Sequence, residues 1–290
     1  MPLIVVPTPL GNLRDVTLRA LDVLRDAAVV VAEDTRVARR LLKALGLAGR
    51  EIWSYREQNA AAVTPGILER ALREVVALTC DAGMPGVSDP GSDLIAAARA
   101  AGVAVEVLPG PSAAIGLATL SGFSLRRFAF EGFPPRTRGA RRGAFASALQ
   151  RGVTTLWYEA PQRILASLAD LAAVAPDAHV FLVREYTKLH EQQLLGTPAE
   201  VASALAEVRG EIAFAIAPYN PRLVDANPSS DGDVDAAIDA LLAEHRRVGD
   251  IAKTLSRRGY GARADLYARA GARKSAGKKG DAASAETSRR

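Results

Sequence analysis

Three segments rich in glycine and proline follow predicted strands in the first half of the chain. They are Pro7–Leu13, Asp81–Gly91 and Pro109–Ala114. Glycine lets a backbone approach a ligand closely, and proline stiffens a loop so that less entropy is lost on binding. The second segment is eleven residues long, longer than most connections between a strand and a helix. We therefore favour a binding cleft over three tight turns, with the turns as the alternative.

Other common chemistries find no support in the sequence. It contains no G-x-G-x-x-G after a predicted strand and no G-x-x-x-x-G-K-[ST], so ordinary dinucleotide and P-loop sites are disfavoured. Cys80 ends a predicted strand with no histidine nearby in the sequence, and we interpret it as a small core residue rather than a nucleophile. With one cysteine and three histidines, we expect neither a disulfide framework nor a metal site.

Charged residues gather at two predicted strand ends in the second half, in Trp157–Arg163 and Arg184–Glu191. Such groups can form a solvated rim, or they can line a site as ion pairs, and the residues alone leave both readings open. Neighbouring Arg–Glu and Lys–Glu side chains can also neutralise one another with little net energy.

A basic segment, Pro134–Arg142, places Arg136, Arg138, Arg141 and Arg142 on a predicted flexible loop. Guanidinium groups suit phosphate oxygens, and a mobile basic loop suits a large polyanion. The alternative is a solvated run of charge in an arginine-rich chain, since 31 of the 37 basic residues are arginine. Both interpretations stay open at this point.

Short β-branched runs alternate with amphipathic stretches rich in alanine and leucine, which predicts a mostly parallel α/β fold. In such a sheet, ligands bind at the carboxyl ends of the strands, where the three loops lie. Ser92 is the expected N-cap of the fourth helix. The first set of expected strands is Leu3–Val6, Ala28–Ala32, Glu51–Ser54, Val75–Cys80 and Val103–Leu108, with helices near 16–26, 35–46, 60–73 and 92–101.

A second set of elements follows, with strands near 127–131, 153–158, 179–184 and 211–217 and helices near 140–150, 161–174 and 197–208. Thr197-Pro198-Ala199-Glu200 is a capping box with proline at the first helical position. The expected organisation is an α/β domain over 1–117, a second over 118–222, a linker over 223–232, a small helical domain over 233–272 and a disordered basic tail over 273–290.

The 290 residues carry a net charge of +5. Residues 274–290 hold five basic and two acidic side chains, so three of the five charges belong to the expected tail. The total charge therefore does not identify a partner. No apolar run approaches the ~20 residues of a membrane span, and Met1–Val6 lacks the charged flank of a signal peptide, so we expect a cytosolic protein.

Taken together, the motifs resemble the tetrapyrrole-methylase superfamily of S-adenosylmethionine-dependent methyltransferases. Within it they are similar to the branch that methylates the ribose 2′-hydroxyl of a cytidine in 16S ribosomal RNA. The matching segments are Ile4–Leu13, Ala32–Arg36, Asp81–Gly91, Leu108–Ala113, Phe130–Phe133, Tyr158–Arg163, Arg184–Lys188 and Gly210–Glu211, in family order.

The resemblance implies two αβα domains of tetrapyrrole-methylase type with a cofactor cleft between them, a small C-terminal helical domain and a cytoplasmic homodimer. S-adenosylmethionine would lie against Pro9, Asp81, Ala82, Gly83, Met84, Val87, Ser88, Gly110, Pro111, Ser112, Ala113, Tyr158, Ala160 and Ile216. Three departures bear on this expectation. Tyr55–Ala60 stands where relatives carry histidines, Met84 where threonine is common and Ala217-Pro218 where glycine is common.

Methylation of a ribose hydroxyl needs a group that accepts the proton or stabilises the developing charge. On the resemblance, the candidates are Glu33, Asp34, Glu159 and Glu185 as acceptors or orienting groups, and Arg184 and Lys188 as electrostatic stabilisers. The partner implied is 16S rRNA or the small ribosomal subunit, held by the four loop arginines and the helical tail. The alternatives are a methyltransferase of a tetrapyrrole or corrin precursor and a non-catalytic RNA-binding assembly factor.

Overall fold

The computed structural model describes residues 2–205, 207–219, 231–244, 246–257, 260 and 262–287. Contacts divide the chain into two units, residues 1–219 and residues 220–290, and each is described by itself. The first unit contains two five-stranded sheets.

The first sheet is entirely parallel, with strand order β3-β2-β4-β1-β5. Its strands are β1 (Pro2–Val5), β2 (Val29–Ala32), β3 (Ile52–Ser54), β4 (Val76–Leu78) and β5 (Ala104–Val107). All four residues of β2 are buried, as are all three of β4. Continuous burial of this kind is typical of parallel strands covered on both faces.

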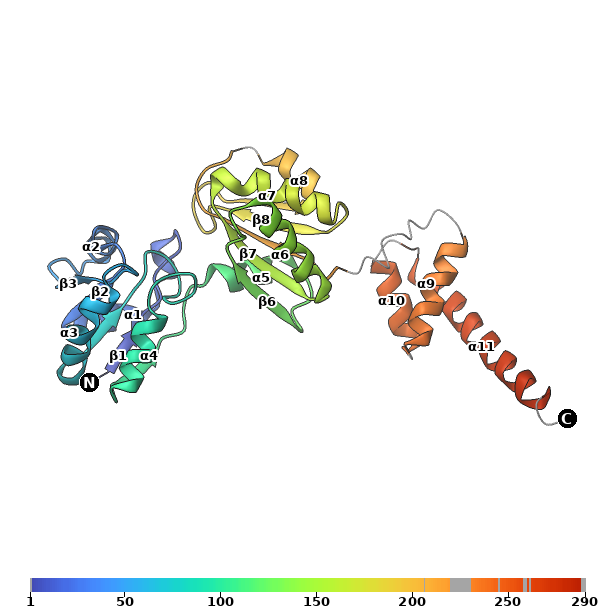
Figure 1. The fold of residues 1–290 in the computed structure, drawn as a ribbon, viewed down its shortest axis with the longest axis horizontal. Helices are drawn as coiled ribbons and strands as arrows, with labels where there is room; N and C mark the ends of the chain where they lie inside the picture. The colour runs from blue at the N-terminus through green and yellow to red at the C-terminus, as the bar shows by residue number, and fades with distance from the viewer. Residues whose placement is uncertain are drawn as a thin grey trace. The chain divides into compact units, whose positions relative to one another are not determined.

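Helices cover both faces of this sheet (Figure 1). The elements are α1 (Leu18–Asp26), α2 (Thr35–Ala44), α3 (Ala60–Arg73) and α4 (Ser92–Ala100), with a short 3-10 helix at Leu13–Asp15. Leu3 packs with α3 and α4, whereas its neighbour Ile4 packs with α1 and α2, because successive strand residues face opposite sides. The predicted N-cap at Ser92 is wrong. Gly91 occupies that position, with φ +144°, and Ser92 begins the helix.

The second sheet has the order β6-β7-β10-β8-β9, and only β6 and β7 pair in parallel. The prediction of a mostly parallel fold is therefore wrong for this half. The elements are α5 (Ala113–Ser121), β6 (Phe128–Gly132), α6 (Arg138–Gln150), β7 (Thr154–Glu159), α7 (Pro161–Val174), β8 (Val180–Arg184), β9 (Gln192–Gly196), α8 (Pro198–Ala204) and β10 (Ile212–Ile216). The expected capping box at Thr197 is confirmed.

Two of these elements do not follow from the sequence patterns. Strand β9, Gln-Gln-Leu-Leu-Gly, has no β-branched residue and pairs along one edge of the sheet with β8. The second element is helix α5. It covers one face of the second sheet, and α6, α7 and α8 cover the other. The expected domain boundary at residue 117 falls inside α5, whose Leu117 and Ala118 pack against β7, β8 and β10.

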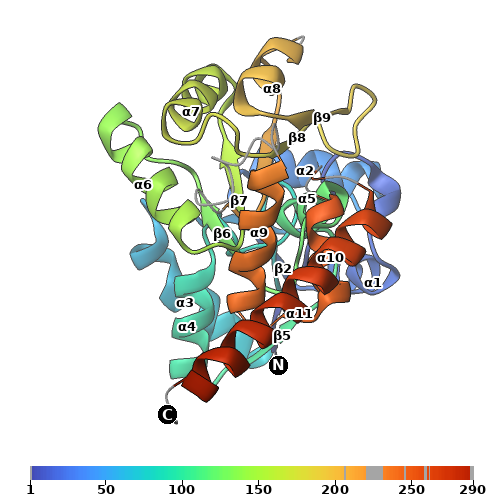
Figure 2. The ribbon, with the colours of Figure 1, turned by 90° about the vertical axis from the view of Figure 1, so that its right-hand side faces the viewer.

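The second unit consists of α9 (Asp231–Ala243), α10 (Val248–Arg257) and α11 (Arg263–Thr287), which are drawn in orange to red in Figure 2. Ile238, Ile251, Leu255 and Leu266 form its core. The helical domain expected over 233–272 and the tail expected over 273–290 differ from the structure here, because α11 continues to Thr287. Most of the expected linker, residues 223–230, lies outside the described residues. Among the described residues, no helix has the length and apolar character that crossing a membrane requires.

Candidate active site

A cavity of about 400 Å³ opens where the loops of the first sheet meet the second sheet. Its wall consists of Leu10, Asp81, Ala82, Gly83, Met84, Val87, Ser88, Asp89, Ser112, Ala113, Phe133, Tyr158, Glu159, Ala160, Pro161, Val183, Tyr186, Gly210, Glu211, Ile212 and Ala213. Residues from all three predicted loop segments contribute, together with the ends of β7, β8 and β10. We call this space the inter-sheet cavity.

Ten of the fourteen residues that the sequence assigned to a cofactor line the inter-sheet cavity. They are Asp81, Ala82, Gly83, Met84, Val87, Ser88, Ser112, Ala113, Tyr158 and Ala160. The structure brings the second and third loops together, as expected from their shared sheet edge.

The other four, Pro9, Gly110, Pro111 and Ile216, are not part of the cavity wall. Gly110 has a packing role, because a Cβ atom there would lie 2.9 Å from Pro7. Ile216 is fully buried at the far end of β10. Since β10 runs antiparallel to β7 and β8, its first residue, Ile212, pairs with Glu159 and Arg184 at their carboxyl ends. The cavity therefore meets the beginning of β10 rather than its end.

Several wall residues are not among those predicted from the sequence, for two different reasons. Leu10 and Asp89 lie inside predicted loops but were not selected from them. Val183, Tyr186, Gly210, Glu211, Ile212 and Ala213 reach the cavity only through the pairing of β8 with β10. No short-range pattern reports that pairing.

The first two loops are tied together at the cavity floor. Thr8 N donates to the Gly83 carbonyl at 2.9 Å, and Gly83 N donates to the Thr8 carbonyl at 3.0 Å. Gly83 has φ +84°, and a Cβ atom there would lie 3.0 Å from Leu10 Cδ2. Glycine is therefore required both by the left-handed backbone and by the close approach of Leu10.

Acidic side chains give the cavity a negative character. Burial raises the pKa of Asp89 to about 6, and the nearby carboxylates of Glu33, Asp81 and Glu211 reinforce the shift against a hydrogen bond from the Cys80 thiol. Partial burial also raises the pKa of Asp81. Because several carboxylates gather here, a cationic ligand would be stabilised.

The rings of Phe133, Tyr158 and Tyr186 form part of the cavity wall. The Tyr158 ring meets Phe130 and Phe133 edge to face, with centroid distances of 4.9 and 5.8 Å. Burial raises the pKa of Tyr158 to about 12, although a hydrogen bond with the Ala114 backbone opposes the shift. The phenol is therefore neutral at physiological pH and serves as a rigid surface.

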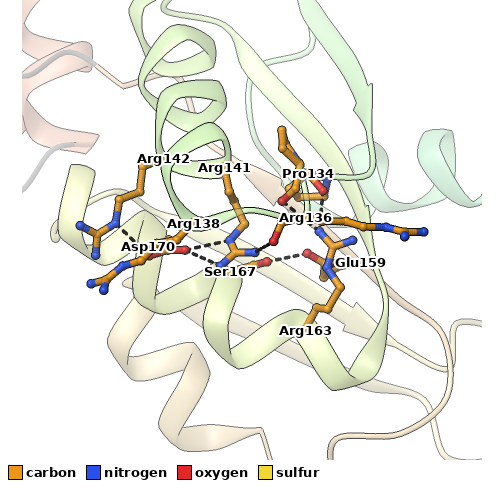
Figure 3. Close-up of polar contacts among 10 residues, drawn as sticks. Pro134, Arg136, Arg138, Arg141, Arg142, Glu159, Arg163, Ser167 and Asp170 are labelled. Atoms are coloured by element: carbon orange, nitrogen blue, oxygen red, sulfur yellow. Dashed lines mark hydrogen bonds and ion pairs between the residues drawn. The ribbon is translucent and has the colours of Figure 1, made fainter.

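Glu159, expected as an acceptor or orienting group, has a fully buried side chain. Its carboxylate accepts hydrogen bonds from Ser167 Oγ at 2.5 Å and from Ala160 N at 2.9 Å, and it forms an ion pair with Arg163 at 3.2 Å (Figure 3). These contacts place it as an orienting group for the end of β7 rather than as a free base.

The other expected catalytic residues are distributed around the site. Asp34 caps α2 and forms an ion pair with the exposed Arg36, outside both cavities described here. Arg184 is buried and contacts the His190 carbonyl at 3.4 Å. It is not part of the wall of the inter-sheet cavity.

Lys188 lies at the rim, where its Nζ atom is 3.0 Å from Glu185 Oε1 and 2.9 Å from Glu211 Oε2. Glu211 lines the inter-sheet cavity, so Lys188 is connected to the wall through it. Burial alone would raise the pKa of Glu185, but hydrogen bonds from the Glu211 backbone and from Lys188 outweigh it and lower that pKa.

The predicted flexible basic loop is partly helical, because α6 begins at Arg138. Arg141 is buried, and its Nε atom donates to Asp170 Oδ2 at 2.9 Å (Figure 3). It is therefore not available to RNA, and that prediction is corrected. Arg142 Nε also donates to Asp170, at 2.8 Å, and Arg138 forms a longer ion pair at 3.3 Å.

A second cavity of about 440 Å³ lies beside the first, and its wall is mostly polar. We call it the polar cavity. It is lined by Glu33, Tyr55, Arg56, Glu57, Gln58, Ala60, Ser88, Asp89, Pro90, Gly91, Ser92 and Asp93. Five residues of Tyr55–Ala60, the stretch that differs from the histidines expected in relatives, thus line a cavity. Pro218, in contrast, is outside both walls.

Cys80 is buried, and burial raises the pKa of its thiol well above the ordinary value. A neutral, buried thiol is a poor nucleophile, which agrees with the expected core role. Met84 lines the inter-sheet cavity and also packs against the core of the first sheet.

Comparisons with known proteins agree with this geometry. Ribosomal RNA small subunit methyltransferase I of Micromonospora olivasterospora is 40% identical over 247 residues, covering 83% of this chain and 76% of that protein. The protein of the same name from Streptococcus pyogenes serotype M1 is 37% identical over 83% of this chain and 81% of its own length.

Solved structures share the fold. Diphthine synthase has a TM-score of 0.60 at 16% identity, over 75% of this chain and 90% of that one. Uroporphyrin III C-methyltransferase from Thermus thermophilus has a TM-score of 0.53 at 22% identity, over 75% and 97%. The sequence profile of the family described as Tetrapyrrole (Corrin/Porphyrin) Methylases matches residues 2–202. The chain belongs to this family of tetrapyrrole methylases.

Proposed function

We propose that this protein is an S-adenosylmethionine-dependent methyltransferase that methylates the 2′-hydroxyl of a cytidine ribose in 16S ribosomal RNA. The observation that carries the proposal is the inter-sheet cavity, which gathers ten expected cofactor residues in a chain about 40% identical to small-subunit rRNA methyltransferases. The assignment of the 2′-oxygen of a cytidine as the methyl acceptor rests on the resemblance of the motifs.

The chemistry of the cavity fits the cofactor. S-adenosylmethionine carries a positive sulfonium and an ammonium group, and Asp81, Asp89 and Glu211 supply negative charge along the wall. Ala82 and Ala113 have small side chains and Gly83 has none, so they leave room beside the backbone. Tyr158 and Phe133 offer ring surfaces to the adenine. Because the sulfonium methyl group is already activated, the main task left to the protein is alignment.

The arginines near the start of α6 support an RNA contact. Arg138, Arg141 and Arg142 share the single carboxylate of Asp170, so this cluster carries two uncompensated positive charges. The side chain of Arg138 is 74% exposed and that of Arg142 is 36% exposed, and Arg136 is also exposed. Anchored guanidinium groups of this kind suit phosphate oxygens. We therefore assign the RNA contact to Arg136, Arg138 and Arg142.

The decisive experiment uses small ribosomal subunits from a strain that lacks the corresponding gene. The purified full chain is incubated with these subunits and cofactor labelled in its methyl group, and the methylated nucleotide is mapped. We expect label in 16S rRNA at one ribose. A parallel assay with tetrapyrrole precursors tests the small-molecule alternative. If the protein binds subunits but neither binds cofactor nor transfers label, it is an assembly factor instead.

The expected homodimer and cytoplasmic location rest on the family resemblance. Size-exclusion chromatography with light scattering tests the first, and fractionation of cells that express the tagged full chain tests the second. A monomer across the micromolar range would contradict the dimer.

A further inference from the structure

Asp89 is part of the lining of both cavities. Within the part of the chain that the structure describes, Ser88 is the other residue shared by both walls. Ser88 is held with φ +65°, a conformation that costs energy for a residue with a side chain. The shared wall is therefore a strained segment with one carboxylate in it.

The polar cavity suits a single nucleoside. Arg56, Gln58 and Ser92 present donors, and Glu33 and Asp93 present acceptors. Single-stranded RNA is read by bases that leave the stack and enter pockets of this kind. A ribose at the end of this cavity that is lined by Ser88 and Asp89 would place a hydroxyl group next to Asp89 and toward the inter-sheet cavity.

The carboxylates around this site differ in how they are neutralised. Glu159 is paired with Arg163, Glu185 and Glu211 share Lys188, and Asp34 is paired with Arg36. Asp89 receives a hydrogen bond from the Cys80 thiol, and the charges acting on it are the carboxylates of Glu33, Asp81 and Glu211. The positive charge of Arg56, which also lines the polar cavity, lowers the pKa of Glu33 and of Asp81 and so opposes the effect of their burial. Tyr158, whose pKa is raised in part by the charge of Asp89, is neutral, and Tyr55, Glu57 and Asp93 are the further titratable residues of the polar cavity.

We propose that Asp89 is the catalytic base, accepting the proton of the ribose hydroxyl whose nucleoside occupies the polar cavity. This inference rests on the proposed function. When bound, the cofactor supplies a methyl group and keeps the electron pair of the broken sulfur–carbon bond as a neutral thioether. The hydroxyl oxygen uses its own electron pair for the new carbon–oxygen bond, and its proton moves to an Asp89 carboxylate oxygen. Asp89 then returns the proton to solvent.

The position of Asp89 and the protonation state of its carboxyl group both support this assignment. A base must reach both the hydroxyl and the space where the methyl group arrives, and Asp89 alone among the nearby carboxylates lines both described cavities. With a pKa of about 6, raised mainly by burial, the carboxylate is largely ionised at neutral pH yet is more basic than an exposed aspartate. Glu33 lines only the polar cavity and is the rival base.

The test compares the full chain with its Asp89→Asn variant, using small subunits as substrate between about pH 5 and about pH 8.5. For the unchanged protein, we expect the single-turnover rate to fall about tenfold per pH unit below pH 6. Asp89→Asn should lower the neutral-pH rate by about 100-fold or more and remove the break near pH 6. Asp26→Asn, an exposed carboxylate at the end of α1, is the matched control and should change neither.

Two measurements without turnover complete the test. Calorimetry should show that Asp89→Asn still binds the cofactor, with a loss of affinity far smaller than the loss of rate, because Asp81 and Glu211 keep their negative charge in the cavity wall. Carbon-13 NMR of labelled aspartate carboxyls should contain a resonance that titrates near pH 6 and disappears in the variant. If Asp89→Asn unfolds, Asp89→Glu replaces it, and we expect this variant to keep a pH break at a reduced rate.

Distinct results overturn the inference. If the subunits are methylated and Asp89→Asn retains its rate and pH break, Asp89 is not the base, although the proposed function stands. Loss of the break in Glu33→Gln but not in Asp89→Asn assigns the role to Glu33. If the unchanged chain transfers no methyl group to the subunits, the proposed function fails and the inference fails with it.

Discussion

Arg141 Nε donates a hydrogen bond of 2.9 Å to Asp170 Oδ2, and both side chains are almost completely buried. The pair joins α6 to α7, and Arg138 and Arg142 add to it from the same side. The buried Arg141–Asp170 pair therefore anchors the exposed Arg138 and the half-buried Arg142. Arg141 is predicted from the sequence to contact RNA, but in the structure it has a packing role instead.

Replacing Asp170 by asparagine should destabilise the protein, because three guanidinium groups would lose their shared carboxylate. We expect a loss of about 3 kcal/mol in the free energy of unfolding, measured by urea titration at neutral pH. The control is Asp22→Asn, whose exposed ion pair with Arg25 should contribute less than about 1 kcal/mol. Equal losses in the two variants would contradict a buried, stabilising pair.

The same pair predicts a pH dependence. Burial alone would raise the pKa of Asp170, but hydrogen bonds from Arg141 and Arg142 outweigh it and hold the pKa below the ordinary value. A depressed carboxyl pKa stabilises the fold above the unfolded value, about 3.9, and this contribution is lost as the pH falls. The acid limb of the stability curve should therefore be shallower in Asp170→Asn.

Neutralising exposed arginines should weaken RNA binding without affecting the cofactor. For Arg136→Gln combined with Arg138→Gln, we expect a lower affinity for small-subunit RNA and a salt slope reduced by about 2, because two phosphate contacts are lost. Arg19→Gln combined with Arg73→Gln removes the same charge from α1 and α3 and is the control. An unchanged slope in the first pair would place the RNA contact elsewhere.

Gly83 offers a test of the inter-sheet cavity as the cofactor site. A Cβ atom at Gly83 would lie 3.0 Å from Leu10, whereas at Gly102, also at positive φ, it would meet nothing within 4 Å. Both alanine variants suffer similar backbone strain of about 1 kcal/mol, but only Gly83→Ala pushes into the cavity wall. Calorimetry should show weakened S-adenosylmethionine binding for Gly83→Ala alone. Equal affinities would argue against this cavity.

The Glu159→Gln variant tests whether Glu159 only orients the end of β7 or also accepts a proton during the reaction. The amide loses the ion pair with Arg163, so we expect the free energy of unfolding to fall by about 2 kcal/mol. The break in the pH–rate profile near pH 6 should remain, since Glu159 is bonded inward to Ser167. Rates at several pH values and urea titrations measure the two effects. Loss of the break would identify Glu159 as a base.

Much of the architecture is determined by local sequence. The helices predicted over 60–73 and 161–174 have those bounds in the structure, because amphipathic spacing and terminal residues are local signals. The continuous β-branched runs of the first half predicted its parallel sheet correctly, and the glycine- and proline-rich loops supply about half of one cavity wall. These signals extend over only a few residues, so they can be recognised without knowing which distant segments pack against them.

Tertiary structure decided which side chains meet. The antiparallel insertion of β10 between β7 and β8 brings Ile212 rather than Ile216 to the cavity. Asp170 lies 29 positions from Arg141 in the sequence, and only the packing of α6 on α7 shows that this arginine is buried. Asp89 likewise borders two cavities because segments far apart in the chain surround it. Strand direction, burial and shared walls depend on long-range pairing, which no local pattern contains.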